Sequence, residues 1–109
     1  IFMGHNGTLY VTDIKGGVRQ IKDGFVCSVF PRLHQPRCIL ADSTDCLFVV
    51  SNAQSGTSEE SIVHKIDLRK KFYVELVRGN FIDSLAFDKD GNLLVGTRSE
   101  LLRLQMPWR

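Results

Sequence analysis

The strongest constraint on this chain of 109 residues is an internal repeat. Three segments share one pattern: a turn residue, a polar or small residue, four mostly apolar residues and a small polar stop. They are residues 7–13, 45–51 and 91–97. The aligned leucines Leu9, Leu47 and Leu93 are 38 and 46 positions apart. Self-similarity at such a period is the signature of stacked repeat architectures, so the chain is predicted to consist of several similar units.

Each unit contains the pattern of a β-hairpin. Residues 39–51 align with residues 85–97 without a gap, at a constant offset of 46. In both segments two short apolar runs flank a centre of Asp, Asn, Gly or Ser, which favours a turn between two strands. The second run is apolar on both of its alternating faces, so this strand is predicted to be covered on both sides.

A third and a fourth strand complete the unit. Residues 18–21, 63–66 and 101–104 are predicted third strands, and residues 24–30 and 72–77 are predicted fourth strands. A polar, Ser-rich segment at residues 52–61 accounts for the longer second spacing and is predicted to be a surface loop. Four antiparallel strands in about 40 residues, with no amphipathic helix, form one blade of a β-propeller. We therefore predict an all-β fold.

The residues of the repeat resemble known propeller families. The NHL-type blade is resembled by two parts of the chain. One consists of residues 36–42 with residues 47–52, and the other of residues 6–13 with residues 18–21. Residues 85–104 are similar to the repeats of two-component-regulator and gluconolactonase-like propellers, at their Asp-Lys-Asp-Gly-Asn-Leu and Gly-Thr-Arg positions. The Trp-Asp ending of WD40 repeats is absent from these units. The resemblance covers nearly the whole chain.

Superposition of the units predicts how the chain divides. Residues 1–109 are expected to form about two and a half four-stranded antiparallel blades, as a fragment of a larger ring. Residues 1–30 would be the end of blade one, residues 36–77 blade two, and residues 81–109 the start of blade three. A ring needs four to eight blades to close, so two apolar faces would stay open. We expect the remaining propeller blades, or further copies of the chain, to cover them.

Composition limits the other classes of function. The chain is 43% apolar and 24% charged, as in soluble globular proteins, and it has no apolar run of the roughly 18–20 residues that span a bilayer. No signal-peptide pattern is visible, so we expect no membrane partner and an intracellular, cytoplasmic location.

The three cysteines, Cys27, Cys38 and Cys46, form no CxxC pair and are interpreted as buried reduced thiols. A single disulfide with one thiol left over is the alternative in an oxidising compartment.

No residues form a convincing catalytic or metal site. Residues 88–92 begin like a calcium loop, but a helix–loop–helix site needs Gly and Glu where this chain has Leu93 and Ser99. A hairpin turn is the favoured interpretation. The three histidines occupy unrelated positions of the repeat, and no nucleophile motif is present. We predict no catalytic residue, no metal and no cofactor.

Basic residues in loops are the remaining candidates for a binding site. Arg32, His34, Arg37 and Arg78 are predicted to lie in loops between blades, and Lys15 and Arg98 in loops between second and third strands. In a propeller these loops emerge on one face, which resembles the usual partner-binding face of the family. A cationic rim suits an acidic protein surface or an RNA backbone. For any one of these residues, an ordinary solvated basic side chain is the more common alternative.

We therefore expect a non-enzymatic interaction or scaffold module, an NHL-like propeller portion that binds a protein partner through its loops. One alternative is a lactonase- or lyase-like propeller enzyme with a central metal, for which Asp83 is the one candidate acid on the mostly apolar inner strands. Another is RNA binding through the basic loop face. A net charge of +2 is too small to argue for nucleic acid by itself, and no aromatic residue is interleaved with the basic ones.

Overall fold

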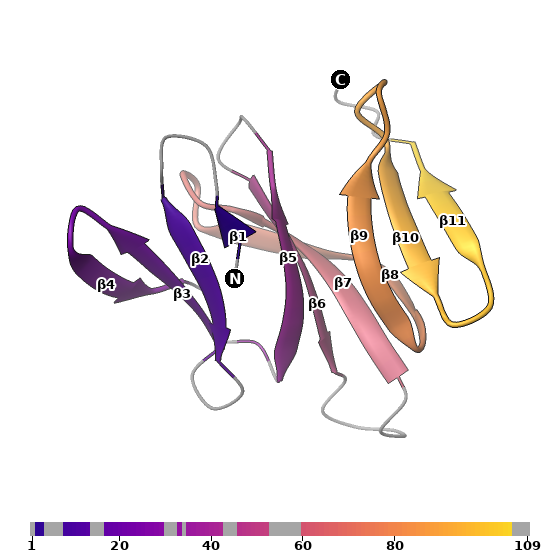
Figure 1. Cartoon of the computed structure of the whole chain (residues 1–109), viewed down its shortest axis with the longest axis horizontal. Helices are drawn as coiled ribbons and strands as arrows, with labels where there is room; N and C mark the ends of the chain where they lie inside the picture. The colour runs from indigo at the N-terminus through magenta and orange to yellow at the C-terminus, as the bar shows by residue number, and fades with distance from the viewer. Residues whose placement is uncertain are drawn as a thin grey trace.

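The protein, described from a computed structural model, is all-β. The structure describes residues 2–3, 8–13, 17–29, 33, 35–42, 46–52 and 60–105, and within these it contains strands, turns and no helix. Three antiparallel sheets lie side by side and are visible from left to right in Figure 1. In each sheet, strands that are consecutive in sequence are also neighbours in space. The predicted all-β fold, with blade-like sheets of three or four strands, is therefore confirmed.

The strands have the following bounds. The first sheet contains β1 (Phe2–Met3), β2 (Leu9–Asp13), β3 (Gly17–Lys22) and β4 (Phe25–Ser28). The second contains β5 (Pro36–Ala41), β6 (Cys46–Asn52), β7 (Glu60–Asp67) and β8 (Phe72–Asn80). The third contains β9 (Ile82–Phe87), β10 (Leu93–Thr97) and β11 (Leu101–Leu104).

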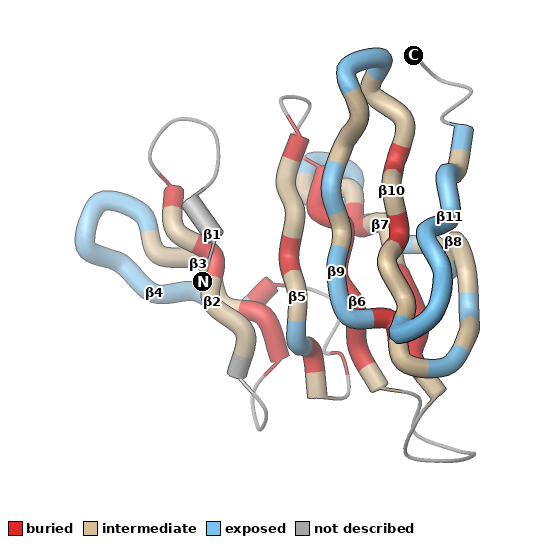
Figure 2. Tube along the Cα trace, turned by 45° about the vertical axis from the view of Figure 1, so that its right-hand side comes forward, coloured by how far each residue is buried: buried red, intermediate tan, exposed pale blue. Residues whose placement is uncertain are grey.

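Burial of β6 on both faces organises the core. Leu47 and Val49 point toward the first sheet and join one apolar cluster, whereas Phe48 and Val50 point toward the third sheet and join a second cluster. All four side chains are 0% exposed, and the strand is buried along most of its length (Figure 2). The prediction that this strand is covered on both sides is confirmed, because a sheet packs against each of its faces.

The two apolar clusters join neighbouring sheets. Between the first and second sheets, Tyr10 and Val18 pack with Ile39 and Ile66. Between the second and third sheets, Phe48 meets the ring of Phe87 edge to face, with centroids 5.4 Å apart, among Ile82, Leu93 and other apolar side chains. Since an apolar cluster lies between each pair of neighbouring sheets, the second sheet is the middle layer of three.

Asp42 and Asp88 close equivalent turns. Asp88 Oδ1 accepts hydrogen bonds from the backbone N–H groups of Asp90 at 2.9 Å and Asn92 at 2.8 Å. Asp42 Oδ1 accepts one from the Cys46 N–H at 3.1 Å. Gly91 has a φ of 83°, a left-handed conformation that glycine adopts without strain. The hairpin interpretation of residues 88–92 is therefore confirmed.

Two predicted loop positions are wrong. Arg78 lies within β8, because β7 starts at Glu60 and pairs with β8 as far as Asn80, so the fourth strand does not end at residue 77. Arg37 lies within β5, at a shift of register between Pro36 and Cys38. Both arginines are thus strand residues whose backbones belong to the second sheet.

The predicted burial of all three cysteines is also wrong in part. All three are free; Cys46 is buried and Cys38 is half-buried, but Cys27 is exposed. Cys27 belongs to β4, an outer strand whose four residues are all exposed.

The described part of the chain contains no helix that is long and apolar enough to cross a membrane.

The two-sided burial of β6 predicts a large effect of truncating Phe48. We expect Phe48→Ala to lower the free energy of unfolding by about 3–5 kcal/mol, the usual cost of a phenylalanine-sized cavity. Phe72→Ala is the matched control, because Phe72 is 59% exposed on β8 and its loss should cost less than about 0.5 kcal/mol. Urea denaturation followed by circular dichroism measures both, and equal losses would contradict the three-layer packing.

The Asp88 turn predicts a specific dependence of stability on pH. The hydrogen bond from the Asn92 backbone is the largest cause that lowers the pKa of Asp88. A carboxyl with a lowered folded-state pKa stabilises the fold above its unfolded pKa of about 4, and this contribution is lost as pH falls through the folded value. We therefore expect Asp88→Asn to reduce the loss of stability of the chain between pH 5 and acidic pH. Unfolding curves across this range test it, and parallel pH profiles of the two proteins would contradict it.

Candidate functional site

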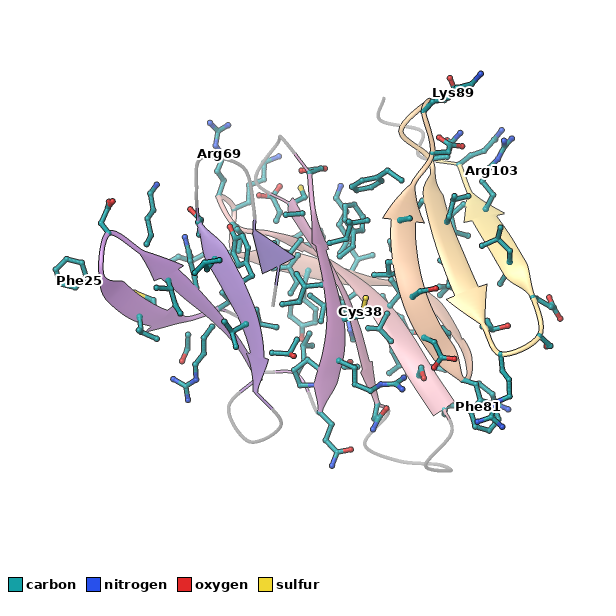
Figure 3. The ribbon with its side chains drawn as sticks, in the orientation of Figure 1. Phe25, Cys38, Arg69, Phe81, Lys89 and Arg103 are labelled. Carbon is teal, nitrogen blue, oxygen red and sulfur yellow. The ribbon has the colours of Figure 1, made fainter. Side chains whose placement is uncertain are left out.

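Three of the predicted binding residues lie toward one end of the sheets, because Arg37 is near the start of β5, Arg78 is near the end of β8 and Arg98 follows β10. This lower end, where Phe81 is labelled in Figure 3, is the end that carries the connections β8–β9 and β10–β11. Of the six predicted residues, Lys15, Arg32 and His34 lie outside the described residues. The other three, Arg37, Arg78 and Arg98, are described, and they differ in what they contact.

Arg37 joins the second sheet to the third. Its Nη2 donates to Ser61 Oγ on β7 at 2.7 Å and to the backbone oxygen of Ile82 on β9 at 2.9 Å. Its Nη1 lies 3.9 Å from Asp83 Oδ1, in a long ion pair of which both side chains are partly exposed. The guanidinium is therefore used within the molecule, as a polar bridge across the apolar interface between the two sheets.

Arg78 lies among acidic side chains on the outer strands of the second sheet. Its Nη1 is 2.7 Å from Glu60 Oε1, and its Nη2 is 2.9 Å from Glu75 Oε1. The hydrogen bond to Glu75, followed by the one to Glu60, raises the pKa of Arg78, and the same contact with Arg78 lowers the pKa of Glu75. Two carboxylates thus offset the one positive charge, which leaves Arg78 poorly suited to attract an acidic partner.

His64 lies beside this acidic cluster, on the third strand as predicted. It pairs with Glu75 across the sheet, and its ring is 5.8 Å from the ring of Tyr73. Burial is the main cause that lowers the pKa of His64, and its Nδ1 is buried without a hydrogen-bond partner in the described part of the chain. A neutral imidazole is therefore favoured near pH 7.

Arg98 differs from the other two arginines. It follows β10, and its guanidinium carbon lies 3.6 Å from the centroid of the Phe81 ring. Phe81 connects β8 to β9 with a φ of 56°, in the left-handed region that non-glycine residues rarely adopt. Among the described residues Arg98 has no acidic partner, so its N–H donors stay available to solvent or to a ligand. Sequence reasoning missed Phe81, because Arg78 was predicted to lie in the loop between blades and residue 81 to begin blade three.

The other candidate sites are less suited to binding or catalysis than the surroundings of Arg98. A cavity of about 410 Å³ opens between the first and second sheets, lined by Gln20, Ser28, Val29, Asp67, Leu68 and Lys71. Oδ1 of Asp67 already accepts hydrogen bonds from the backbone N–H groups of Arg69 and Lys70. Within the described ranges, no three His, Cys, Asp or Glu side chains are placed to hold a metal ion. Asp83, the candidate acid of the enzyme alternative, is the partner of Arg37.

Comparison with known proteins supports the fold class. Residues 77–99, from the end of β8 through the Asp88 turn to the residues after β10, match the family model described as two component regulator propeller. No curated protein and no solved structure matches the chain. The described sheets are blade-like, and residues 77–99 are similar to a β-propeller repeat. The resemblance to two-component-regulator propellers that was predicted for residues 85–104 is confirmed where the two ranges overlap, at residues 85–99, whereas the match gives no support to the NHL type.

The Arg37 bridge predicts a loss of stability that Arg78 does not share. Arg37→Met removes two hydrogen bonds that cross between strands, and we expect it to lower the free energy of unfolding by about 1–3 kcal/mol. Arg78→Met removes only exposed ion pairs and should change it by about 1 kcal/mol or less. Urea denaturation of the two variants measures the difference. If Arg78→Met proved to be the more damaging change, the assignment of Arg37 as a bridge would be wrong.

Proposed function

We propose that this chain is a non-enzymatic interaction module that binds an acidic segment of a protein partner at its lower end, with Arg98 as the recognition residue. The contrast between the three described arginines carries the proposal. Arg37 and Arg78 bind groups of the chain itself, whereas Arg98 rests on Phe81 and has no acidic partner in the described residues. Of these three arginines, Arg98 is thus the one that can bind a new carboxylate without first breaking an ion pair.

The Phe81 ring prepares Arg98 for binding. A guanidinium held against an aromatic face keeps its N–H groups available, and it loses less side-chain freedom when a ligand binds. Hydrogen bonds to charged groups contribute about 1.5–3 kcal/mol. Arg98 also stands on a short connection between two strands of a sheet, the kind of rigid support on which binding residues are commonly placed.

The two alternatives have weaker support. An enzyme with a central metal would need several oxygen or nitrogen ligands, and the candidate acid Asp83 lies against a cation, Arg37. RNA binding depends on several unpaired positive charges, because each phosphate contact contributes separately. With Arg37 and Arg78 balanced by carboxylates, the described residues favour a short acidic peptide over a nucleic acid.

Fluorescence anisotropy with three labelled probes tests the proposal. The probes are a short glutamate-rich peptide, the same peptide with glutamine in place of glutamate, and a single-stranded RNA. We expect the glutamate peptide to bind most tightly, and Arg98→Ala to weaken it about tenfold to a hundredfold, because a charge-assisted contact is lost.

Two further variants serve as controls. Phe81→Leu should weaken binding less than Arg98→Ala, since it removes the aromatic support but keeps the charge. Lys89→Ala removes a positive charge at the opposite end of the sheets and should leave the affinity unchanged (Figure 3). Equal binding of the glutamate and glutamine peptides, tighter binding of RNA, or no effect of Arg98→Ala would each reject the proposal.

A further inference from the structure

The repeat gives each sheet two distinct faces. We call the face that points toward the preceding sheet in sequence the leading face, and the opposite one the trailing face. The leading face of the second sheet packs on the trailing face of the first, and the leading face of the third packs on the trailing face of the second. The molecule therefore makes the same kind of interface twice, always leading against trailing.

The leading face of the first sheet carries the residues of a buried interface. At the equivalent positions of the other two sheets, the apolar side chains are 0% exposed. They are Leu47 and Val49 of β6, and Leu93 and Val95 of β10. The first sheet has Leu9 and Val11 there, and Ile21 lies opposite Leu9 as Ile66 lies opposite Leu47. These three side chains are only half-buried, because no described sheet packs against this face.

The trailing face of the third sheet also carries apolar residues that are buried at the equivalent positions of the other sheets. Tyr10 and Phe48, which follow the aligned leucines on β2 and β6, are 7% and 0% exposed. At the same position β10 has Leu94, which is half-buried. Likewise, Val18 and Val63 are 0% exposed, whereas the equivalent Leu101 of β11 is 70% exposed. Each uncovered face thus holds apolar residues at positions that are buried wherever a neighbouring sheet is present.

We propose that a second copy of this chain covers these faces, with the trailing face of the third sheet of one copy packed on the leading face of the first sheet of the other. The reason for choosing a second copy is that each copy carries both halves of an interface that the molecule already makes twice. Leu94 and Leu101 of one copy then contact Leu9, Val11 and Ile21 of the other. Two copies bring six sheets, a number within the four to eight blades of closed propellers.

The driving force is the burial of apolar surface. Removal of apolar surface from water is favourable in proportion to the area that is buried. The contact is head to tail, so the two copies use different faces to meet. Both faces of each copy are covered only when the copies form a closed ring. This inference is independent of the acidic-partner proposal, because Arg98 and Phe81 lie at the lower end of the sheets and not on either face.

Size-exclusion chromatography with light scattering tests the assembly. The 109-residue chain is expected to have twice its monomer mass of 12.3 kDa. Val11→Asp places a charge on the leading face and Leu94→Asp places one on the trailing face, and we expect each variant to be a monomer. Phe72→Asp is the control and should keep the wild-type mass, since Phe72 is an exposed residue of the second sheet, which contributes to neither uncovered face.

Mixing the two variants separates assembly from misfolding. The Val11→Asp copy retains an intact trailing face, and the Leu94→Asp copy retains an intact leading face. Their mixture should therefore form a heterodimer through one intact interface, which unfolded variants could not do. A monomeric wild-type chain, an oligomer that both substitutions leave unchanged, or a mixture that stays monomeric would overturn the proposal.

Discussion

The burial of β6 on both faces is the constraint on which the rest of this structure depends. When a strand carries apolar side chains on both of its faces, one neighbouring layer covers only one face and leaves the other exposed to water. Leu47 and Val49 need a sheet on one side, whereas Phe48 and Val50 need a sheet on the other. The second sheet must therefore be a middle layer, and the chain must supply structure before it and after it.

The same alternation links the local sequence to the shape of the molecule. β2 and β10 repeat the pattern of β6, so the side chains that are covered in the middle sheet recur in the outer two. Polar residues are placed where the strands end, and there the carboxylates of Asp42 and Asp88 accept hydrogen bonds from the backbone N–H groups of Cys46 and Asn92. Apolar residues hold the layers together, and polar side chains at the ends define where each strand stops.

The fold was largely predictable from the sequence because its signals are local. The alternation within residues 46–50 and the turn residues around Asp88 depend on neighbouring positions only, and both predicted the observed structure. The extension of β8 was not predictable in this way, since residues 78–80 resemble a turn and become a strand only because β7 offers partners from Glu60 onward. The roles of the arginines were also missed, because Arg37 contacts Ile82, 45 positions away, and Arg98 contacts Phe81. Such contacts exist only after the sheets have come together.

The choice of acceptor for Arg37 has a consequence for how such chains can evolve. Of the two groups that receive hydrogen bonds from Nη2, the one on the neighbouring sheet is the main-chain oxygen of Ile82. Every amino acid carries that oxygen, so the bridge is insensitive to the identity of the residue it reaches. Hydrogen bonds are directional whereas apolar contacts are not, and the hydrogen bond to Ile82 therefore aligns the two layers without using the side chain at that position. A duplicated unit placed beside Arg37 would be held in register from the start, before any of its side chains had adapted.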